Sequence, residues 1–216
     1  MSKIIQLNEL DRFIKDGMKI MVGGFIESGC PKNIIQYIQE KNIKDITLIA
    51  NTTGFKSKPL GQLIVKKRVK KVIASHIGTN SETAKLMNNK EMEVELIPQG
   101  TLAERIRIQG AGIGGFLTPT GIGTKVEENK EKIEVDGKSY LLELPLKADV
   151  AFLKAWKADE SGNLIYRYSS RNFNPIMAMA ADLVIVEAEE ITETGSLDAN
   201  QVMTPGIFVD YIVELD

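Results

Sequence analysis

The chain has 216 residues, 43% of them hydrophobic and 26% charged, so it can bury a sizeable core beneath a charged surface. Its formal net charge of −2 offers no basic field to attract nucleic acid or an anionic membrane. One cysteine and one histidine exclude an internal disulfide framework and leave too few ligands for a zinc site, so we expect no metal. The first residues lack the apolar core of a signal peptide, and no later run suits a membrane span, which predicts a cytoplasmic protein.

The first half of the chain alternates short apolar runs with helical patterns. The strand candidates, rich in β-branched residues, are 19–24, 46–51, 70–76 and 93–99. The helix candidates that follow them are 31–41, 58–67, 81–90 and 101–108. Strands and helices that alternate at this spacing predict an α/β fold, in which a mainly parallel sheet carries helices on both faces.

The second half adds an antiparallel excursion. A glycine-dense segment, 109–124, precedes residues 132–144, where Asp136 and Gly137 supply the positive φ angles of a tight hairpin turn. Further buried-strand candidates are 148–156, 163–168, 181–189 and 208–215. No repeat or linker interrupts the chain, so we expect a single domain that spans residues 1–216.

Two glycines, Gly23 and Gly24, stand where the first buried strand ends, and Pro31 stands where a helix should begin. Ser28 or Cys30 would then be the N-cap, and a helix N-terminus would lower the pKa of the Cys30 thiol. One interpretation is a backbone cradle for a nucleotide-like or acyl ligand, since helix N-termini and strand ends bind such groups. The other is a tight turn whose glycines only permit close packing.

Residues 16–31, DGMKIMVGGFIESGCP, resemble the N-terminal signature of the family I CoA-transferases. Residues 91–116, 162–181 and 203–213 are similar to three further blocks of the α subunits of that family, in the same order. The likeness is greatest to the acetate/butyrate–acetoacetate type. It implies the CoA-transferase (NagB-like) fold and a β subunit as partner, in an α2β2 or larger assembly.

The resemblance also implies the reaction. CoA would move between a short acyl-CoA (acetyl-CoA, butyryl-CoA or acetoacetyl-CoA) and acetate, butyrate or acetoacetate, through a glutamyl-CoA thioester. CoA is then a substrate, and no permanently bound cofactor is needed. The nucleophilic glutamate of the family lies in a Ser-Glu-Asn-Gly run of the β subunit, and that run is absent here. Glu27, Glu104 and Glu187 match no such motif, and Glu104 is expected to pair with Arg105 or Arg107.

Two groups of site residues follow from the resemblance. The segment that contacts CoA comprises Gly24, Phe25, Ile26, Glu27, Ser28, Gly29 and Cys30. Gln99 would donate a hydrogen bond to the reacting oxyanion, since a neutral amide donates without titrating. From the local pattern alone, Gln99 lies in a loop before a helix capped by Thr101 with Glu104, and it could equally bind loop backbone.

Other residues have a functional and an ordinary interpretation. Candidates to line the site or contact the partner are Gly100, Gly112, Gly114, Asn172, Phe173 and Asn174. Gly110 could be an ordinary helix C′ residue, and the basic cluster 65–72 is either a phosphate contact or a solvated helix end.

Two rival functions remain open. One is a sugar-phosphate isomerase type of enzyme from the wider superfamily, which would need an acid/base carboxylate of its own. The other is a non-catalytic CoA-binding or regulatory subunit.

Overall fold

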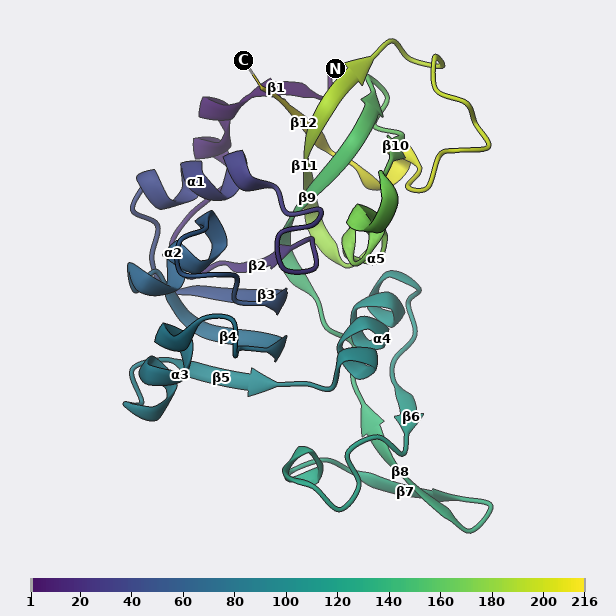
Figure 1. Ribbon diagram of the computed structural model, residues 1–216. Helices are drawn as coiled ribbons and strands as arrows, with labels where there is room; N and C mark the ends of the chain where they lie inside the picture. The colour runs from purple at the N-terminus through teal and green to yellow at the C-terminus, as the bar shows by residue number, and fades with distance from the viewer. Residues whose placement is uncertain (1, 216) are drawn as a thin grey trace.

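The computed structural model describes residues 2–215 and is built around one large sheet (Figure 1). The strand order is β1-β12-β11-β9-β2-β3-β4-β5, every neighbouring pair in it is parallel, and β10 pairs antiparallel with β9. The strands are β1 (Ile4–Gln6), β2 (Lys19–Val22), β3 (Ile46–Thr52), β4 (Val69–His76), β5 (Glu93–Leu96), β9 (Ala148–Asp159), β10 (Leu164–Ile165), β11 (Ala181–Thr192) and β12 (Tyr211–Glu214). The prediction of a mainly parallel sheet is confirmed.

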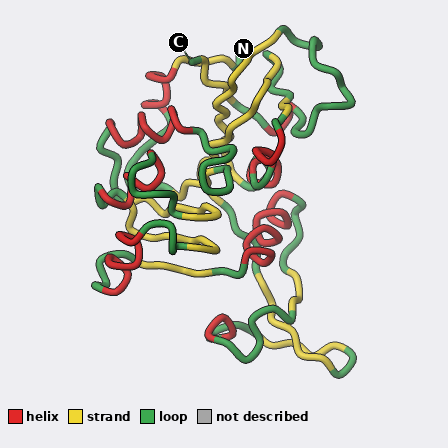
Figure 2. Tube along the Cα trace, viewed as in Figure 1, coloured by secondary structure: helices red, strands yellow, loops and turns green. Residues whose placement is uncertain are grey.

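Helices cover both faces of this sheet (Figure 2). They are α1 (Lys32–Glu40), α2 (Pro59–Val65), α3 (Ser81–Asn88), α4 (Gln99–Gly110) and α5 (Asn174–Met177). Ile20 and Val22 of β2 pack with α1, α2 and α3, whereas Met21 between them packs with α4 and α5. Side chains of a strand alternate between its faces, so each buried strand supplies two separate cores.

The antiparallel excursion forms a second, small sheet that projects from the main one (Figure 1). Its strands are β6 (Phe116–Thr118), β7 (Lys132–Val135) and β8 (Lys138–Glu143), in the order β6-β8-β7. Asp136 and Gly137 have φ angles of 50° and 71°, so the predicted hairpin turn is confirmed. β6 lies within the glycine-dense segment, where the sequence indicated no strand.

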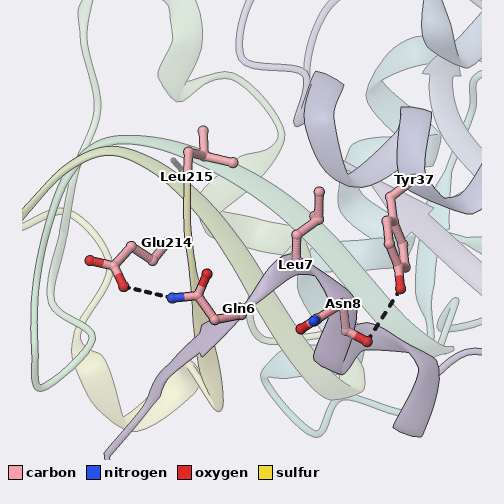
Figure 3. A pocket seen from close by; sticks show the side chains of 6 residues that line it. All are labelled: Gln6, Leu7, Asn8, Tyr37, Glu214 and Leu215. Atoms are coloured by element: carbon pink, nitrogen blue, oxygen red, sulfur yellow. Dashed lines mark hydrogen bonds between the residues drawn. The ribbon is translucent and has the colours of Figure 1, made fainter.

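The two ends of the chain lie side by side, because β1 pairs with β12. There Gln6 donates a hydrogen bond to Glu214 (2.9 Å), and the Tyr37 hydroxyl of α1 donates to the Asn8 carbonyl (3.2 Å), around a hollow of about 280 Å³ (Figure 3). Neither β1 nor the 3₁₀ helix Leu7–Arg12 that follows it was predicted. Further 3₁₀ helices are Lys125–Glu127, Tyr168–Arg171 and Gly206–Phe208.

The N-terminus of α1 is capped by a carboxylate from a distant strand. Pro31 is the N-cap residue and no local side chain caps the helix, so the predicted caps Ser28 and Cys30 are wrong. Instead Glu187 of β11, only 1% exposed, accepts hydrogen bonds from the backbone N–H groups of Asn33 (2.8 Å) and Ile34 (3.1 Å). This carboxylate satisfies donors that a helix start otherwise leaves unpaired.

Lys154 of β9 completes this arrangement. Its ammonium group lies 3.1 Å from the Glu187 carboxylate, and the two residues face each other in the parallel β9–β11 register. A buried carboxylate needs such a partner, since an isolated buried charge is costly. The buried pair therefore joins two central strands to the start of α1.

The start of α4 differs from its prediction. The helix begins at Gln99 after the N-cap Pro98, so Thr101 lies in its first turn rather than at its cap. Glu104 makes two hydrogen bonds with Arg107 (2.8 and 2.7 Å), so its predicted pairing with an arginine is confirmed. Gln99 consequently lies in the first helical turn instead of in a free loop.

The end of α4 lies later than predicted. Gly112, with φ +68°, is the C′ residue; its N–H binds the Gln109 carbonyl (3.3 Å), and the next N–H, of Ile113, binds the Ile108 carbonyl (3.0 Å). Gly110 is still helical, and a Cβ there would lie 2.3 Å from Cβ of Met179. The glycine lets α4 approach the segment after α5.

The buried pair generates a stability prediction. Replacing Glu187 with alanine uncaps α1 and leaves Lys154 without its buried partner. We expect the free energy of unfolding to fall by about 3–5 kcal/mol. Urea unfolding, followed by the fluorescence of the single tryptophan, Trp156, measures this change. Glu190→Ala is the matched control, because Glu190 lies on the same strand in a more exposed pair with Lys157, worth about 0–1 kcal/mol. Equal losses in both variants would contradict the capping role.

Candidate functional site

The loop after β2, the start of α4 and the segment that leads into α5 enclose a shallow cavity of about 290 Å³. Five of the predicted site residues line it: Phe25, Gln99, Gly100, Asn172 and Phe173. Ala103 of α4 and Ile176 of α5 complete the wall. Carboxyl ends of parallel strands meet at one edge of a sheet, which is why blocks distant in sequence converge there.

The loop after β2 is a tight turn with a strained residue. Phe25 and Ser28 exchange two backbone hydrogen bonds (2.9 and 3.1 Å), so Ile26 and Glu27 form the tip. Ile26 has φ +56°, a left-handed conformation that a β-branched residue adopts only under constraint. Phe25 remains 47% exposed at the rim of the cavity, available for contact with an apolar group.

Asparagines from the segment before α5 hold this loop in place. Asn172 donates to the Ser28 carbonyl (3.0 Å), and Asn174 donates to the Gly29 carbonyl (3.1 Å). Asn174 is fully buried, so it supports the loop and does not line the cavity, contrary to the prediction. A Cβ at Gly23 would lie 1.9 Å from the Asn174 side-chain oxygen, and one at Gly29 would lie 2.5 Å from the Ser170 carbonyl oxygen. These glycines are required by the close approach of the two segments.

The amide of Gln99 is held by two residues that the sequence analysis missed. Asn51 of β3 donates through Nδ2 to Oε1 of Gln99 (2.6 Å), and the Ser75 hydroxyl of β4 donates to the same oxygen. Within residues 2–215, Nε2 of Gln99 makes no hydrogen bond to another residue, and the side chain is exposed beside the cavity. Asn51 and Ser75 each lie near the end of an apolar strand, and the two strands end at the same edge of the sheet. This position is the feature of the sequence that could have identified them.

Residues 27–30 face a second, polar cavity of about 410 Å³. Lys32, Lys154, Glu187 and Glu189 also line this polar cavity. The segment predicted to contact CoA is therefore divided, with Phe25 beside Gln99 and Glu27 to Cys30 on the other side of the turn. The cradle interpretation required free N–H groups at the start of α1 to bind an anionic ligand. The N–H groups of Asn33 and Ile34 already donate to Glu187, so they are not available for this.

The Cys30 thiol is buried, and burial raises its pKa to about 12, helped by the neighbouring carboxylates of Glu27 and Glu187. The expectation of a lowered pKa is wrong. The reason is that the helix N-terminus acts on Glu187, while the thiol meets two negative charges in a desolvated position.

Several other predicted residues lie outside both cavities. Gly112 and Gly114 follow α4 and line neither of them. The basic cluster lies at the amino end of β4, where Lys67 binds Glu91 (2.5 Å) and Lys71 binds Glu93 (2.6 Å). That position favours the solvated-helix-end interpretation over phosphate binding.

Neither a metal-binding cluster nor a membrane-spanning helix is found in residues 2–215. No group of three or more histidine, cysteine, aspartate or glutamate side chains there could hold a metal ion. None of the helices described has both the length and the apolar character needed to cross a bilayer.

Comparison with known proteins places these observations in a family. The family model described as Coenzyme A transferase matches residues 6–215. The acetate CoA-transferase subunit alpha of Escherichia coli K12 is 52% identical over 98% of this chain and 96% of its own length. The acetoacetyl-CoA:acetate/butyrate CoA transferase alpha subunit of Clostridium acetobutylicum is 51% identical over 99% of this chain and 98% of its own length.

A solved structure supports the fold. The glutaconate coenzyme A-transferase of Acidaminococcus fermentans superposes with a TM-score of 0.87 over 98% of this chain and 75% of that one. The two sequences are only 20% identical, so this likeness concerns the fold alone. The predicted CoA-transferase fold is confirmed.

The environment of Cys30 generates a reactivity prediction. A pKa of about 12 in place of 9.0 leaves about a thousandfold less thiolate at pH 8, and thiolate is the reactive form. We expect iodoacetamide to alkylate the folded protein at least that much more slowly than the urea-unfolded protein, measured by mass spectrometry. Similar alkylation rates in the folded and unfolded protein would contradict the burial and raised pKa of the Cys30 thiol.

Proposed function

Because this chain belongs to the coenzyme A transferase family, we propose that it is the α subunit of an enzyme that moves CoA between a short acyl-CoA and a short carboxylate. The acyl group is acetyl, butyryl or acetoacetyl, and the acceptor is acetate, butyrate or acetoacetate. Support for this range comes from the two bacterial alpha subunits more than 50% identical to this chain, whose names carry acetate, acetoacetyl-CoA and butyrate.

The observation that carries the proposal is the placement of Gln99. Its side-chain oxygen is occupied by Asn51 and Ser75, and its N–H groups, which bind no other residue of the range 2–215, lie beside the cavity that Phe25 also lines. An amide N–H donor fixed at the rim of a cavity suits an oxyanion that develops during acyl transfer. The neutral amide keeps this capacity at any physiological pH.

In the proposed reaction a glutamate carboxylate attacks the carbonyl carbon of the acyl-CoA thioester. The CoA thiolate leaves, and an acyl-glutamyl anhydride forms. The thiolate then attacks the glutamyl carbonyl, which releases the first carboxylate and leaves a glutamyl-CoA thioester. The second carboxylate reverses these steps. Each attack passes through an oxyanion, and Gln99 is the proposed donor to it.

The attacking glutamate is proposed to lie on the β subunit. None of the residues that line the Gln99 cavity carries a carboxylate. Glu187 is buried as the cap of α1, Glu104 is bound to Arg107, and Glu27 lies on the polar side of the turn, 3.6 Å from Lys32. The same arrangement disfavours the isomerase alternative, which requires an internal acid/base carboxylate. We propose an α2β2 or larger assembly with the site at the subunit interface.

The remaining assignments stay predictions. We propose that residues 1–216 act as a single domain, that Gly24–Cys30 contact CoA, and that Gly100, Asn172 and Phe173 line the acyl site. Gly112 and Gly114 are proposed to contact the β subunit rather than the substrate. CoA is a substrate, with no permanently bound cofactor, and the location is cytoplasmic.

Removing the proposed donor tests the function directly. In the complex reconstituted with the β subunit, Gln99→Ala should lower kcat/KM by about 100- to 1000-fold, as expected for loss of one oxyanion donor. Steady-state kinetics with acetoacetyl-CoA and acetate measure this. Gln109→Ala is the matched control, since Gln109 lies near the opposite end of the same helix. Unchanged turnover of Gln99→Ala would remove the donor role.

Covalent trapping tests the division of labour. We expect transferase activity only when this chain is co-expressed with its β subunit, and a CoA thioester on a glutamate of that partner after incubation with acyl-CoA. Peptide mass spectrometry locates the adduct. Activity of this chain alone, or an adduct on Glu27, Glu104 or Glu187, would contradict the proposal.

A further inference from the structure

Asn51 and Ser75 lie on adjacent strands under the first turn of α4. The β3–β4 register pairs Ala50 with Ala74 and Thr52 with His76, so Asn51 and Ser75 are opposite each other. The neighbouring residues Ile49 and Ala50 pack on opposite faces of the sheet, and Ile49 faces α4. Side chains alternate along a strand, so Asn51 and Ser75 project toward the face that carries α4 and Gln99.

These two residues act on one end of the Gln99 amide. Asn51, 2% exposed, directs Nδ2 to Oε1 of Gln99 (2.6 Å) and to the Ser75 hydroxyl oxygen (3.1 Å). The Ser75 hydroxyl lies near the Asn51 backbone oxygen (3.0 Å) and nearer still to Oε1 of Gln99. Oε1 of Gln99 therefore accepts two hydrogen bonds, while Nε2 donates none to any other residue in the range 2–215.

The two ends of a glutamine amide are nearly equal in shape and opposite in function. Rotation by half a turn would replace the N–H donors at the cavity with an oxygen, which repels an oxyanion. Donors contribute to catalysis only when their orientation is fixed before the reaction. Something must hold the Gln99 amide in one of its two orientations.

We propose that Asn51 and Ser75 are positioning residues that hold the Gln99 amide with its nitrogen toward the cavity. This inference rests on the proposed donor role of Gln99. The other amide atom of Asn51, Oδ1, is buried without a hydrogen bond to any part of the chain that the structure describes. The polar contacts of the Asn51 amide are therefore made by its nitrogen, to Ser75 and Gln99.

The isosteric substitution Asn51→Asp inverts the arrangement. An ionised carboxylate only accepts hydrogen bonds, so it binds Nε2 of Gln99 and turns Oε1 toward the cavity. In the reconstituted complex we expect kcat to fall at least 100-fold, with the KM for acyl-CoA within about threefold of wild type. Protonation of the introduced carboxyl group restores a donor, so the ratio of variant to wild-type kcat should fall as pH rises through the pKa of that group.

Ser75 supplies a graded second test. Ser75→Ala removes one of the two donors to Oε1 and should lower kcat by about tenfold, since Asn51 still holds the amide. Ser75→Thr keeps the hydroxyl and should retain most of the kcat that Ser75→Ala loses. Trp156 fluorescence and size-exclusion chromatography of the complex verify folding and assembly for every variant. A kcat for Ser75→Thr no higher than that for Ser75→Ala would overturn the role of the hydroxyl.

Combining Asn51→Asp with Gln99→Ala distinguishes the donor role of Gln99 from the positioning role of Asn51. With Gln99 absent, Asn51→Asp should cause no further loss and no pH-dependent ratio. If Gln99→Ala alone leaves turnover unchanged, the donor role fails and the positioning role with it. If Gln99→Ala is slow but Asn51→Asp retains wild-type kcat and pH profile, only the positioning role is overturned. An equal loss from Asn51→Asp with and without Gln99 would also overturn it.

Discussion

The buried carboxylate of Glu187 connects the sheet to the site. It accepts hydrogen bonds from the backbone N–H groups of Asn33 and Ile34 in the first turn of α1 and pairs with Lys154 on the neighbouring central strand. Because α1 begins directly after the loop 24–30, fixing its first turn against β11 also fixes the end of that loop. A local serine cap would tie the helix only to its own chain segment, whereas this cap ties it to the centre of the sheet.

The same constraint explains why the backbone of the loop is bare. Gly23 and Gly29 approach Asn174 and the Ser170 carbonyl so closely that a Cβ at either position would collide with them. Asn172 and Asn174 then bind the loop carbonyls, and the turn carries the strained residue Ile26 at its tip. The glycines thus serve close packing, and this packing presents Phe25 at the cavity. The close approaches support the packing interpretation of the glycine pair, and ligand contact by the loop stays a prediction.

The site resembles half of an acyl-transfer centre. It offers an oriented amide, an exposed aromatic ring and loop backbone, whereas Glu187 caps α1 and Glu27 and Glu104 are paired with Lys32 and Arg107. A glutamate introduced by a partner subunit would meet a donor that is already in place. In the proposed enzyme, the nucleophile and the donor would thus be brought together only by assembly of the two subunits.

The sequence by itself determined the strand–helix alternation, the Asp136-Gly137 hairpin and the family, because these depend on local periodicity, turn chemistry and contiguous motifs. It also indicated Phe25, Gln99 and Asn172, which the fold gathers around one cavity. It could not reveal β6, the true start of α4, the cap Glu187 or the pair Asn51 and Ser75. The start of α4 follows the N-cap Pro98 directly, whereas the others depend on pairing between residues far apart in the chain: strand register decides which side chains face each other, and register is a property of the assembled sheet. The raised pKa of Cys30 has the same origin, since only tertiary burial among carboxylates opposes the effect expected from its place before a helix.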